Sequence, residues 1–494
     1  MKIAVLCDLH LPLLTSAAQY AILDWAVENI VSERTDLTVT VGDTSAGGDV
    51  EALEYYLDRL REHNHMFLLG NSDIRDQQSA EEIISKYAGS RSIETHGYRI
   101  LGISTPFAWL TEQDKELLKT AEDGNIVCMH HDFSSLNEES KAFFAEVLGQ
   151  KALTVIHGHK HKEMEAFIGK SKLIGLTGQD PDKAMGGPRI AYFELTETGY
   201  TKYDRVFEID RAWCRDVLGQ IGISCFDPEN DIDYATRNGI RNIEIQLRNE
   251  RDLEHYPIIR EKVSVWRERG GRYLSCHLPE LRLTDGVIQG IERWYRAIEI
   301  VLALNPDGVT VHVPRASVKD MLVDGAYWRQ YLGHYIKGLK KLSGKTKIGI
   351  ENLHMIKQHK ANNGERLFGV NPEECLMWID ALNVYLGENR VGAVLDVGHA
   401  TNNSVFRSRY TRSMWYEIVG KRTVAYHVHQ VINVPGEGLK NHYEISDWLG
   451  MTISYASFFW AWGKKRINHA PVFLEMRTLE MCDVSISVLK ALDI

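Results

Sequence analysis

Eight short β-rich segments recur through the second half of the chain, and they constrain its fold more than any other feature. Most are separated by room for one crossover helix, and the first gap is the tightest. Eight β/α units within about 280 residues match the size of a (β/α)8 barrel. We therefore expect an α/β protein with such a barrel over residues 217–494. The expected strands are Ile221–Cys225, Asn242–Gln246, Tyr273–His277, Gly308–His312, Lys347–Glu351, Val391–Asp396, Thr423–His429 and Pro471–Glu475.

The first half of the chain has a different rhythm. Short β-rich runs up to about Glu208 each end in a polar cluster, with helical patterns such as Ser16–Ser32 and Asp49–Glu62 between them. A helical stretch begins near residues 208–217, so we place a boundary there and expect a first domain over residues 1–207. The expected strands are Lys2–Cys7, Leu37–Val41, Met66–Leu69, Ile126–Met129 and Leu153–Ile156, followed by the antiparallel pair Arg189–Leu195 and Tyr203–Phe207.

The overall charge limits the classes of partner. Lys and Arg number 57 and Asp and Glu number 67, which leaves a net charge of −10 over 494 residues. This balance weighs against a surface that binds nucleic acid everywhere, although it allows a local basic cleft. Seven cysteines without a CxxC pair favour reduced thiols. With no signal-peptide pattern and no apolar run of about 18 residues, we expect a cytoplasmic protein without a membrane partner.

Polar residues follow five successive strands of the first half. Residues two apart on a strand share a face, so the side chains of Asp8 and His10 can reach one ion. Ligands of an open α/β sheet bind at this edge, where the strands end. A central carboxylate such as Asp43 could bridge two cations. The residues are Asp8, His10, Asp43, Asn71, His130, His159 and His161.

The order D-x-H, G-D, G-N, H, G-H-x-H resembles the calcineurin-like metallophosphoesterase superfamily over residues 1–207. The resemblance implies an αββα sandwich and two divalent metals, Mn, Fe or Zn, that activate water for attack on phosphorus. Asp43, Asn71 and His130 would be catalytic. One metal would be held by Asp8, His10, Asp43 and His161, and the second by Asp43, Asn71, His130 and His159.

Two departures from the family pattern bear on the substrate. Many members have His after the Asn of G-N, where this chain has Ser72, which cannot act as a general acid near neutral pH. Similarity to the members that lack this His implies a phosphodiester or a good leaving group. Leu176–Gln179 replaces the N-P-G-S of the family, so substrate contacts there remain open. His131 and His157 are expected to be structural.

The barrel strands also end in potential ligands. Catalytic residues of such barrels come from the C-terminal ends of several strands. Mixed imidazole and carboxylate ligands suit Zn, Mn or Fe, and a shared carboxylate suits a two-metal cluster. The residues are His277, His312, Glu351, Asp396, His399, His427 and Glu475.

This pattern resembles the xylose isomerase-like superfamily, which includes endonuclease IV-like nucleases and sugar isomerases or epimerases. Both branches share a quartet, matched here by Glu351, Asp396, His427 and Glu475. In the epimerase branch the two Glu residues move a proton beside one metal. The additional His277 and His312 are more similar to the nuclease branch, in which up to three metals cleave a phosphodiester. The resemblance thus implies one to three metals, Zn or Mn, and catalytic roles for Glu351 and Glu475.

A third barrel metal would require further ligands. His399 and His442 are available, but Lys440 stands where the nuclease branch has an Asp, which favours a two-metal cluster. His429 could be a ligand or could contact the substrate or a ligand. In the loop after the sixth strand, three arginines could bind a phosphate or could form a solvated loop. They are Arg407, Arg409 and Arg412.

Taken together, these patterns predict a bifunctional metal-dependent phosphoesterase that acts on a small molecule or a nucleic acid, with nucleic-acid processing or repair as one role. The first alternative is a phosphatase fused to a metal-dependent sugar or sugar-phosphate isomerase or epimerase. In a second alternative, one half binds without turnover. The sequence leaves the physiological substrate, the metal identities and the oligomeric state open.

Overall fold

The computed structural model describes residues 1–494 except 76, 88, 90, 96, 198, 249, 324, 343, 356–364, 404–405, 407–408, 451 and 493–494. The chain divides into two compact units. The first contains Met1–Ile209 and Leu449–Ser457, and the second contains Asp210–Trp448 and Phe458–Ile494. None of the helices within the described residues is long and apolar enough to cross a membrane.

The first unit contains two sheets. In the five-stranded sheet the order is β11-β10-β1-β2-β3, and β1, β2 and β3 are parallel. In the six-stranded sheet the order is β4-β5-β6-β7-β9-β8, with β5, β6, β7 and β9 parallel. The strands are β1 (Lys2–Leu6), β2 (Leu37–Val41), β3 (His65–Leu68), β4 (Arg91–Thr95), β5 (Tyr98–Ile103), β6 (Ile126–Met129), β7 (Thr154–His157), β8 (Met164–Ile168), β9 (Ser171–Gly175), β10 (Arg189–Thr196) and β11 (Gly199–Val206).

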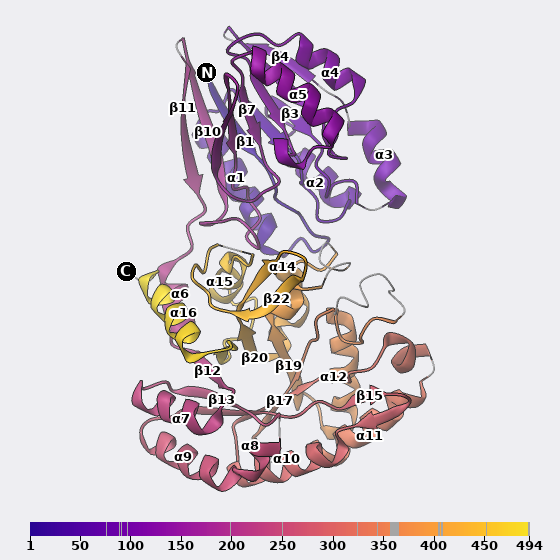
Figure 1. Ribbon diagram of the computed structural model, residues 1–494, viewed down its shortest axis with the longest axis vertical. Helices are drawn as coiled ribbons and strands as arrows, with labels where there is room; N and C mark the ends of the chain where they lie inside the picture. The colour runs from indigo at the N-terminus through magenta and orange to yellow at the C-terminus, as the bar shows by residue number, and fades with distance from the viewer. Residues whose placement is uncertain are drawn as a thin grey trace. The chain divides into compact units, whose positions relative to one another are not determined.

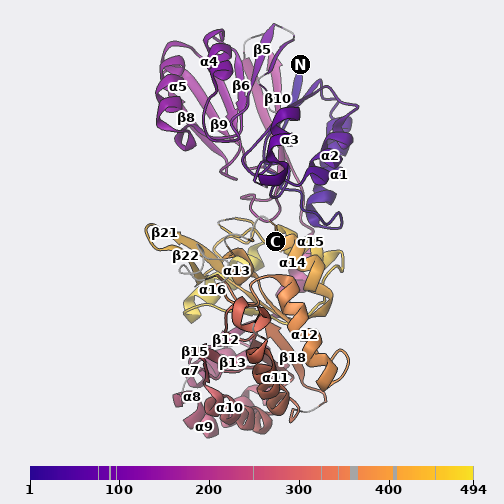
Figure 2. The ribbon, with the colours of Figure 1, turned by 90° about the vertical axis from the view of Figure 1, so that its right-hand side faces the viewer.

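Alternation along β1 shows how the layers form. Ala4 and Leu6 face the core under the helices of the first sheet, whereas Ile3 and Val5 face the core between the two sheets. A third core joins the second sheet to its own helices, and Figure 2 shows helices on both outer faces. This arrangement confirms the predicted αββα sandwich. The helices are α1 (Ala18–Ser32), α2 (Val50–Leu60), α3 (Gln77–Tyr87), α4 (Glu112–Lys119) and α5 (Glu138–Gln150).

The second unit contains a closed barrel of eight parallel strands, which confirms the predicted (β/α)8 fold (Figure 1). Its strands are β12 (Ile221–Cys225), β13 (Asn242–Gln246), β14 (Tyr273–His277), β17 (Gly308–His312), β18 (Lys347–Glu351), β19 (Val391–Asp396), β20 (Thr423–Val428) and β23 (Val472–Leu474). The helices are α6 (Arg211–Leu218), α7 (Pro228–Arg237), α8 (Glu250–Glu254), α9 (Tyr256–Glu268), α10 (Ile291–Leu304), α11 (Ala326–Leu339), α12 (Pro372–Leu386), α13 (Val397–Thr401), α14 (Arg412–Val419), α15 (Ala456–Gly463) and α16 (Leu479–Ala491).

Several hairpins differ from the sequence expectation. The strands β4, β5, β8 and β9 of the first unit were not predicted, and the barrel carries two additional hairpins after β14 and β20. The solvent-facing strands among them, such as β4 and β8, lack the strong period-two apolar pattern from which strands are predicted. The additional barrel strands are β15 (Arg282–Thr284), β16 (Val287–Gln289), β21 (Gln430–Val434) and β22 (Gly438–Tyr443).

The packing of α10 against α11 yields a stability prediction. A Cβ atom on Gly338 of α11 would lie 2.0 Å from Cζ3 of Trp294, which is fully buried on α10. A Cβ on Gly333 of the same helix would meet no atom within 4 Å. We expect Gly338→Ala to lower the free energy of unfolding by about 1–3 kcal/mol through overpacking. Gly333→Ala should raise it by up to about 1 kcal/mol through helix propensity.

Denaturant unfolding of the two variants, followed by circular dichroism, measures this difference. Equal shifts of the unfolding midpoint in the two variants would contradict the close approach of the two helices.

Candidate metal centres

The structure brings the predicted ligands of the first unit together at the carboxyl ends of its parallel strands. Asp8 and His10 follow β1, Asp43 follows β2, and the remaining ligands follow β3, β6 and β7. The ligand atoms of Asp8, His10 and His161 lie within 4.8 Å of one another. His130, His131 and His159 form a second such group.

Asp43 lies between the two groups. Its Oδ1 is 3.3 Å from Nε2 of His130, and its Oδ2 is 3.6 Å from Nε2 of His10. Nε2 of His130 is in turn 3.1 Å from Oδ1 of Asn71 and 3.3 Å from Nδ1 of His159. The structure therefore brings the residues of both predicted ligand sets close together, with one Asp43 oxygen near His10 and the other near His130.

Proton positions test whether these residues fit a cation. Nδ1 of His130 is 2.9 Å from the carbonyl oxygen of Val41, so the proton of the neutral imidazole lies on Nδ1 and Nε2 presents a lone pair. When the amide oxygen of Asn71 points to His130 and His159, this oxygen faces only hydrogen-bond acceptors, an arrangement that a bound cation would satisfy. In the opposite orientation its nitrogen would donate to both imidazoles over 3.1 Å. The converging lone pairs fit a divalent metal.

Electrostatics at this site also favour positive charge. Burial raises the pKa of Asp8 to about 7 against the opposing effect of the nearby His130, and the Asp43 carboxylate adds a smaller upward contribution. Burial disfavours the charged form of His130, yet the Asp43 carboxylate raises the pKa of this imidazole to about 9. Both shifts show that the buried carboxylates favour positive charge at this site.

The backbone holds these residues in an unfavourable conformation. Asp8, His10, Asp43, His159 and His161 all have positive φ, between 51° and 72°. Non-glycine residues rarely adopt such values, and the cost is accepted mainly where surrounding structure imposes it at a functional site. The strain is concentrated on five of the seven predicted ligands.

The glycines of the motifs allow the ligand loops to approach one another. A Cβ on Gly70 would lie 2.3 Å from Oδ1 of Asp43, and a Cβ on Gly158 would lie 2.5 Å from Oδ2 of Asp8. Each glycine therefore leaves space for a carboxylate that belongs to a different motif. This explains physically why G-N and G-H accompany the ligands.

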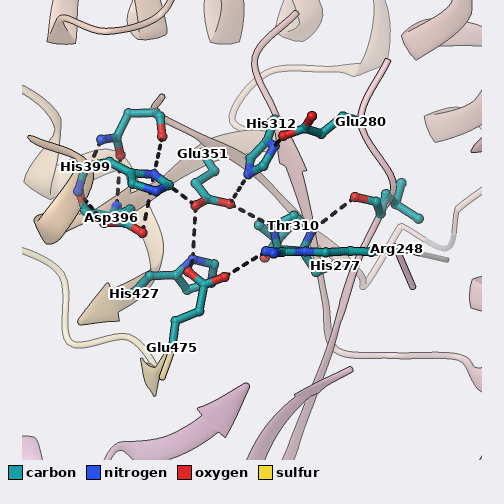
Figure 3. A network of polar contacts seen from close by, with 12 residues as sticks. Arg248, His277, Glu280, Thr310, His312, Glu351, Asp396, His399, His427 and Glu475 are labelled. Atoms are coloured by element: carbon teal, nitrogen blue, oxygen red, sulfur yellow. Dashed lines mark hydrogen bonds and ion pairs between the residues drawn. The ribbon is translucent and has the colours of Figure 1, made fainter. Parts of the chain in front are cut away.

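In the barrel, Glu351 occupies the central position (Figure 3). Its Oε2 is 2.8 Å from Nε2 of His277 and 2.9 Å from Nε2 of His312. Its Oε1 is 3.3 Å from Nδ1 of His427, which is itself 3.1 Å from Oε2 of Glu475. Glu351 is fully buried at the end of β18 and is shared by two ligand groups. One group contains His277 and His312, and the other contains Asp396, His427 and Glu475.

Several of these buried atoms have no hydrogen-bond partner among the described residues. They include Oε1 of Glu351, Nδ1 of His427 and Oε2 of Glu475, although each lies close to another ligand atom. Buried polar atoms are normally satisfied, and an uncompensated buried charge is costly. Carboxylate oxygens and imidazole nitrogens that converge in this way fit divalent metals bridged by Glu351.

A third group consists of His399, His429 and His442. Nδ1 of His399 is 3.0 Å from the carbonyl oxygen of Asn352, and Nδ1 of His442 is 3.0 Å from that of Glu475. These contacts direct both Nδ1 protons to the backbone and leave both Nε2 atoms as ligand candidates. The sequence left the role of His429 open. In the structure, its Nε2 is 3.2 Å from Oδ1 of Asp396. Lys440 pairs with Glu437 on the hairpin that carries His442.

The structure describes two of the three arginines predicted as phosphate ligands, and they have different surroundings. Arg412 is buried at the start of α14, where its Nη1 donates to Oγ1 of Thr401. The guanidinium of Arg409 lies over the ring of Tyr410, 5.6 Å from its centroid. Arg407 lies outside the described residues. Phosphate binding by this loop stays a prediction.

Glu244 is a functional candidate that the sequence reasoning missed. It is fully buried in the middle of β13, and its Oε1 is 2.8 Å from Nε2 of His427. Its other oxygen accepts from Ser275 and Thr310. A carboxylate on the far nitrogen of a metal-binding histidine fixes the tautomer and the ring orientation. The sequence signal was an acidic residue between two isoleucines in the middle of β13, whereas most of the predicted ligands lie at or just after strand ends.

Comparison with known proteins is consistent with both units. Residues 1–163 match the calcineurin-like phosphoesterase family, and residues 232–491 match the xylose isomerase-like TIM barrel family. No curated protein matches the chain.

Similar solved structures include a D-tagatose 3-epimerase-like protein, with 17% identity and a TM-score of 0.38. They also include the IOLI protein with a zinc atom (14%, 0.38) and the D-psicose 3-epimerase of Clostridium cellulolyticum with D-tagatose (13%, 0.37). Each match covers 55% of this chain and 96%, 96% and 97% of the respective structure.

The contact between Gly70 and Asp43 leads to a prediction on metal content. We expect Gly70→Ala to displace the Asp43 carboxylate and to reduce the metal bound by the first unit. Gly149→Ala serves as the control, because a Cβ there would meet no atom within 4 Å. Elemental analysis of the purified variants measures the effect. An unchanged metal content in Gly70→Ala would show that Asp43 does not hold a metal in the arrangement described.

The contact between Glu244 and His427 leads to a second prediction. We expect Glu244→Gln to weaken barrel metal binding by about 10–100-fold, because the His427 ring loses its anionic partner. Glu299→Gln, which alters an exposed partner of Lys341, is the control. Metal affinity is measured by competition with a chelator. If both variants retain the affinity of the unmodified protein, Glu244 does not position a metal ligand.

Proposed function

We propose that this chain is a bifunctional metal-dependent phosphoesterase. The chain belongs to the xylose isomerase-like TIM barrel family and carries a calcineurin-like phosphoesterase domain before the barrel. Residues 1–207 would form one catalytic domain and residues 217–494 the other. The observation that carries the proposal is the position of Glu351 between two ligand groups. A second group containing His277 and His312 extends the cluster beyond the quartet that serves a single metal.

In the first domain, Asp43 would hold two metals, with Asn71 and His130 completing one of the two ligand sets. Divalent metals bound there would activate water and neutralise charge that develops on the phosphate oxygens. Water adds to phosphorus and the ester P–O bond breaks, releasing an alcohol. The metals in this domain would be Mn, Fe or Zn, and those in the barrel would be one to three Zn or Mn ions.

The side chains around the first site favour a phosphodiester substrate. Oγ of Ser72 is 3.3 Å from Nδ1 of His10, and its backbone N–H donates to Oδ1 of Asp43 over 2.7 Å. Residue 72 therefore supports the ligands and has no acidic proton to give to a leaving group. Burial lowers the pKa of His131 to about 3, so this neighbouring imidazole is neutral near pH 7. A phosphodiester with a good leaving group depends least on protonation of the leaving oxygen, and this is why we favour such a substrate.

The barrel site would cleave a phosphodiester or act on a sugar phosphate. In the barrel site, Glu351 and Glu475 would bind the metals and act as catalytic residues, and Asp396 and His427 would be further metal ligands. If the barrel is a nuclease, both domains act on phosphate esters, and nucleic-acid processing or repair is then one proposed role. The substrate would be a small molecule or a nucleic acid rather than a membrane component. All seven cysteines are buried and lie outside any disulfide, which supports our proposal of a cytoplasmic location.

A second candidate function is a phosphatase fused to a sugar or sugar-phosphate isomerase or epimerase. It is supported by the quartet Glu351, Asp396, His427 and Glu475, which forms a ligand group of its own. In that reaction the two glutamates would move a proton at carbon beside one metal. His277 and His312 would then have no catalytic task, which is why we favour phosphoester hydrolysis.

Separate inactivation of the two sites tests the proposal. With Mn or Zn, bis-p-nitrophenyl phosphate hydrolysis should fall at least about 100-fold in Asp43→Asn, because a shared metal ligand is weakened. Scission of an oligonucleotide with an abasic site should fall similarly in Glu351→Gln. Each variant is the control for the other reaction.

Two results would decide against this assignment. Ketose–aldose conversion that is lost in Glu351→Gln, without strand scission in the unmodified protein, would establish the isomerase alternative for the barrel. Activities that all respond to only one of the two substitutions would make the other domain a binding module.

A further inference from the structure

A cavity of about 740 Å³ lies beside the ligand candidates of the barrel, and His277 forms part of its wall. Its volume is within the range of sites that bind small molecules or parts of larger ones. Four arginines line it, Arg248, Arg282, Arg293 and Arg315, and we call it the arginine pocket. The pocket therefore joins a metal-ligand cluster to a concentration of positive charge.

The arginines come from separate elements that follow neighbouring strands. Arg248 follows β13, Arg282 begins the β15–β16 hairpin, Arg293 lies on α10, and Arg315 follows β17. The hairpin and α10 both lie between β14 and β17 in the chain. The positive charge is thus built into the loops on the same end of the barrel as the ligands, which is where such barrels bind their substrates.

Two carboxylates connect the arginine pocket to the ligand cluster. Arg248 donates to Oε1 of Glu475 over 2.7 Å, and Figure 3 shows this contact. Glu280 accepts from Nη1 of Arg315 over 2.8 and 2.9 Å, and its Oε1 is 2.9 Å from Nδ1 of His312. An anion held by these arginines would consequently lie directly beside the residues that surround Glu351.

Charge within the wall is unbalanced. Against four arginines, Glu280 is the one acidic residue among the described residues of the lining, so the lining itself carries 4 − 1 = 3 positive charges, counting histidine as neutral. Glu475 and Glu250, which lie outside the lining, offset part of this charge through their pairs with Arg248 and Arg293. The whole chain has a net charge of −10. Each guanidinium presents five N–H donors in a planar fork, more than one carboxylate can accept, and this geometry matches phosphate oxygens. Neutral sugars would not require such a wall.

We propose that the arginine pocket binds a phosphate group of the barrel substrate. This inference rests on the proposed phosphoester function of the barrel and identifies the chemical class of its ligand. The phosphate could belong to a sugar phosphate or to the backbone of a nucleic acid, and the shared chemistry is a phosphate ester placed next to the ligand cluster. Neutral sugars are excluded as the main ligand.

The chain offers a matched pair of variants for the test. Arg293 and Arg296 lie on the same helix and donate to the same carboxylate, Glu250, over 2.8 and 3.2 Å. Their side chains are similarly exposed, at 43% and 49%. Arg293 lines the arginine pocket, whereas Arg296 is outside the lining. Arg293→Gln and Arg296→Gln therefore remove the same charge from the same helix and differ in their position relative to the pocket.

Binding is measured by calorimetry on the full-length chain with D-ribose 5-phosphate, neutral D-ribose and a short single-stranded DNA. We expect Arg293→Gln to weaken binding of a phosphate-bearing probe about tenfold, because one charge-assisted contact is lost. The affinity of Arg296→Gln for the phosphate-bearing probe should be unchanged, and so should the affinity of both variants for D-ribose. Arg282→Gln, with an exposed side chain on the hairpin, should reproduce the loss without disturbing the fold. Binding to the first domain is the same in all variants and cancels in the comparison.

The possible outcomes separate the sources of the phosphate. A loss confined to D-ribose 5-phosphate supports a sugar phosphate, and a loss confined to DNA supports a nucleic-acid backbone. Equal affinities in Arg293→Gln and Arg296→Gln overturn the proposal, as does an equal loss for D-ribose or an unmodified protein that binds no phosphate-bearing probe. Since no turnover is measured, failure of the catalytic proposal would not change these binding results.

Discussion

The central constraint on this protein is the burial of a carboxylate between two groups of potential metal ligands, and it occurs twice. Asp43 is 3% exposed and Glu351 is fully buried, and each directs its two oxygens toward different imidazoles. A buried charge is tolerated when it is paired or coordinates a metal. Neighbouring carboxylates such as Asp8 and Glu475 increase the need for positive charge. The surrounding structure can be understood as a means of holding these groups together.

Two unrelated folds satisfy this constraint by the same geometric device. Parallel strands end at one edge of the sandwich sheets and at one end of the barrel, so the residues after the strands converge without long loops. The sandwich adds backbone strain at residues such as Asp8 and Asp43 and relies on Gly70 for a close approach of two loops. The barrel instead relies on buried polar support, with Glu244 behind His427. The two sites differ in how rigidity is obtained.

Much of this architecture could be predicted from the sequence, because strands buried on both faces have a simple apolar signature and ligands cluster where they end. The eight barrel strands and most parallel strands of the sandwich were predicted to within a few residues. Glu244 was missed because its partner, His427, is nearly two hundred residues away in the chain, a separation that motif spacing does not reveal. The exposed hairpins and the arginine pocket depend on tertiary contacts between loops, so no local pattern identifies them.

These observations lead us to propose that Glu351 bridges two metals rather than binding one, and this is the central claim about the barrel. Anomalous diffraction from crystals of the full-length protein grown with Mn or Zn tests it most directly. The account predicts separate peaks on the two sides of Glu351, one beside His277 and His312 and the other beside His427 and Glu475. A single peak within the quartet, with none beside His277 and His312 under saturating metal, would contradict it.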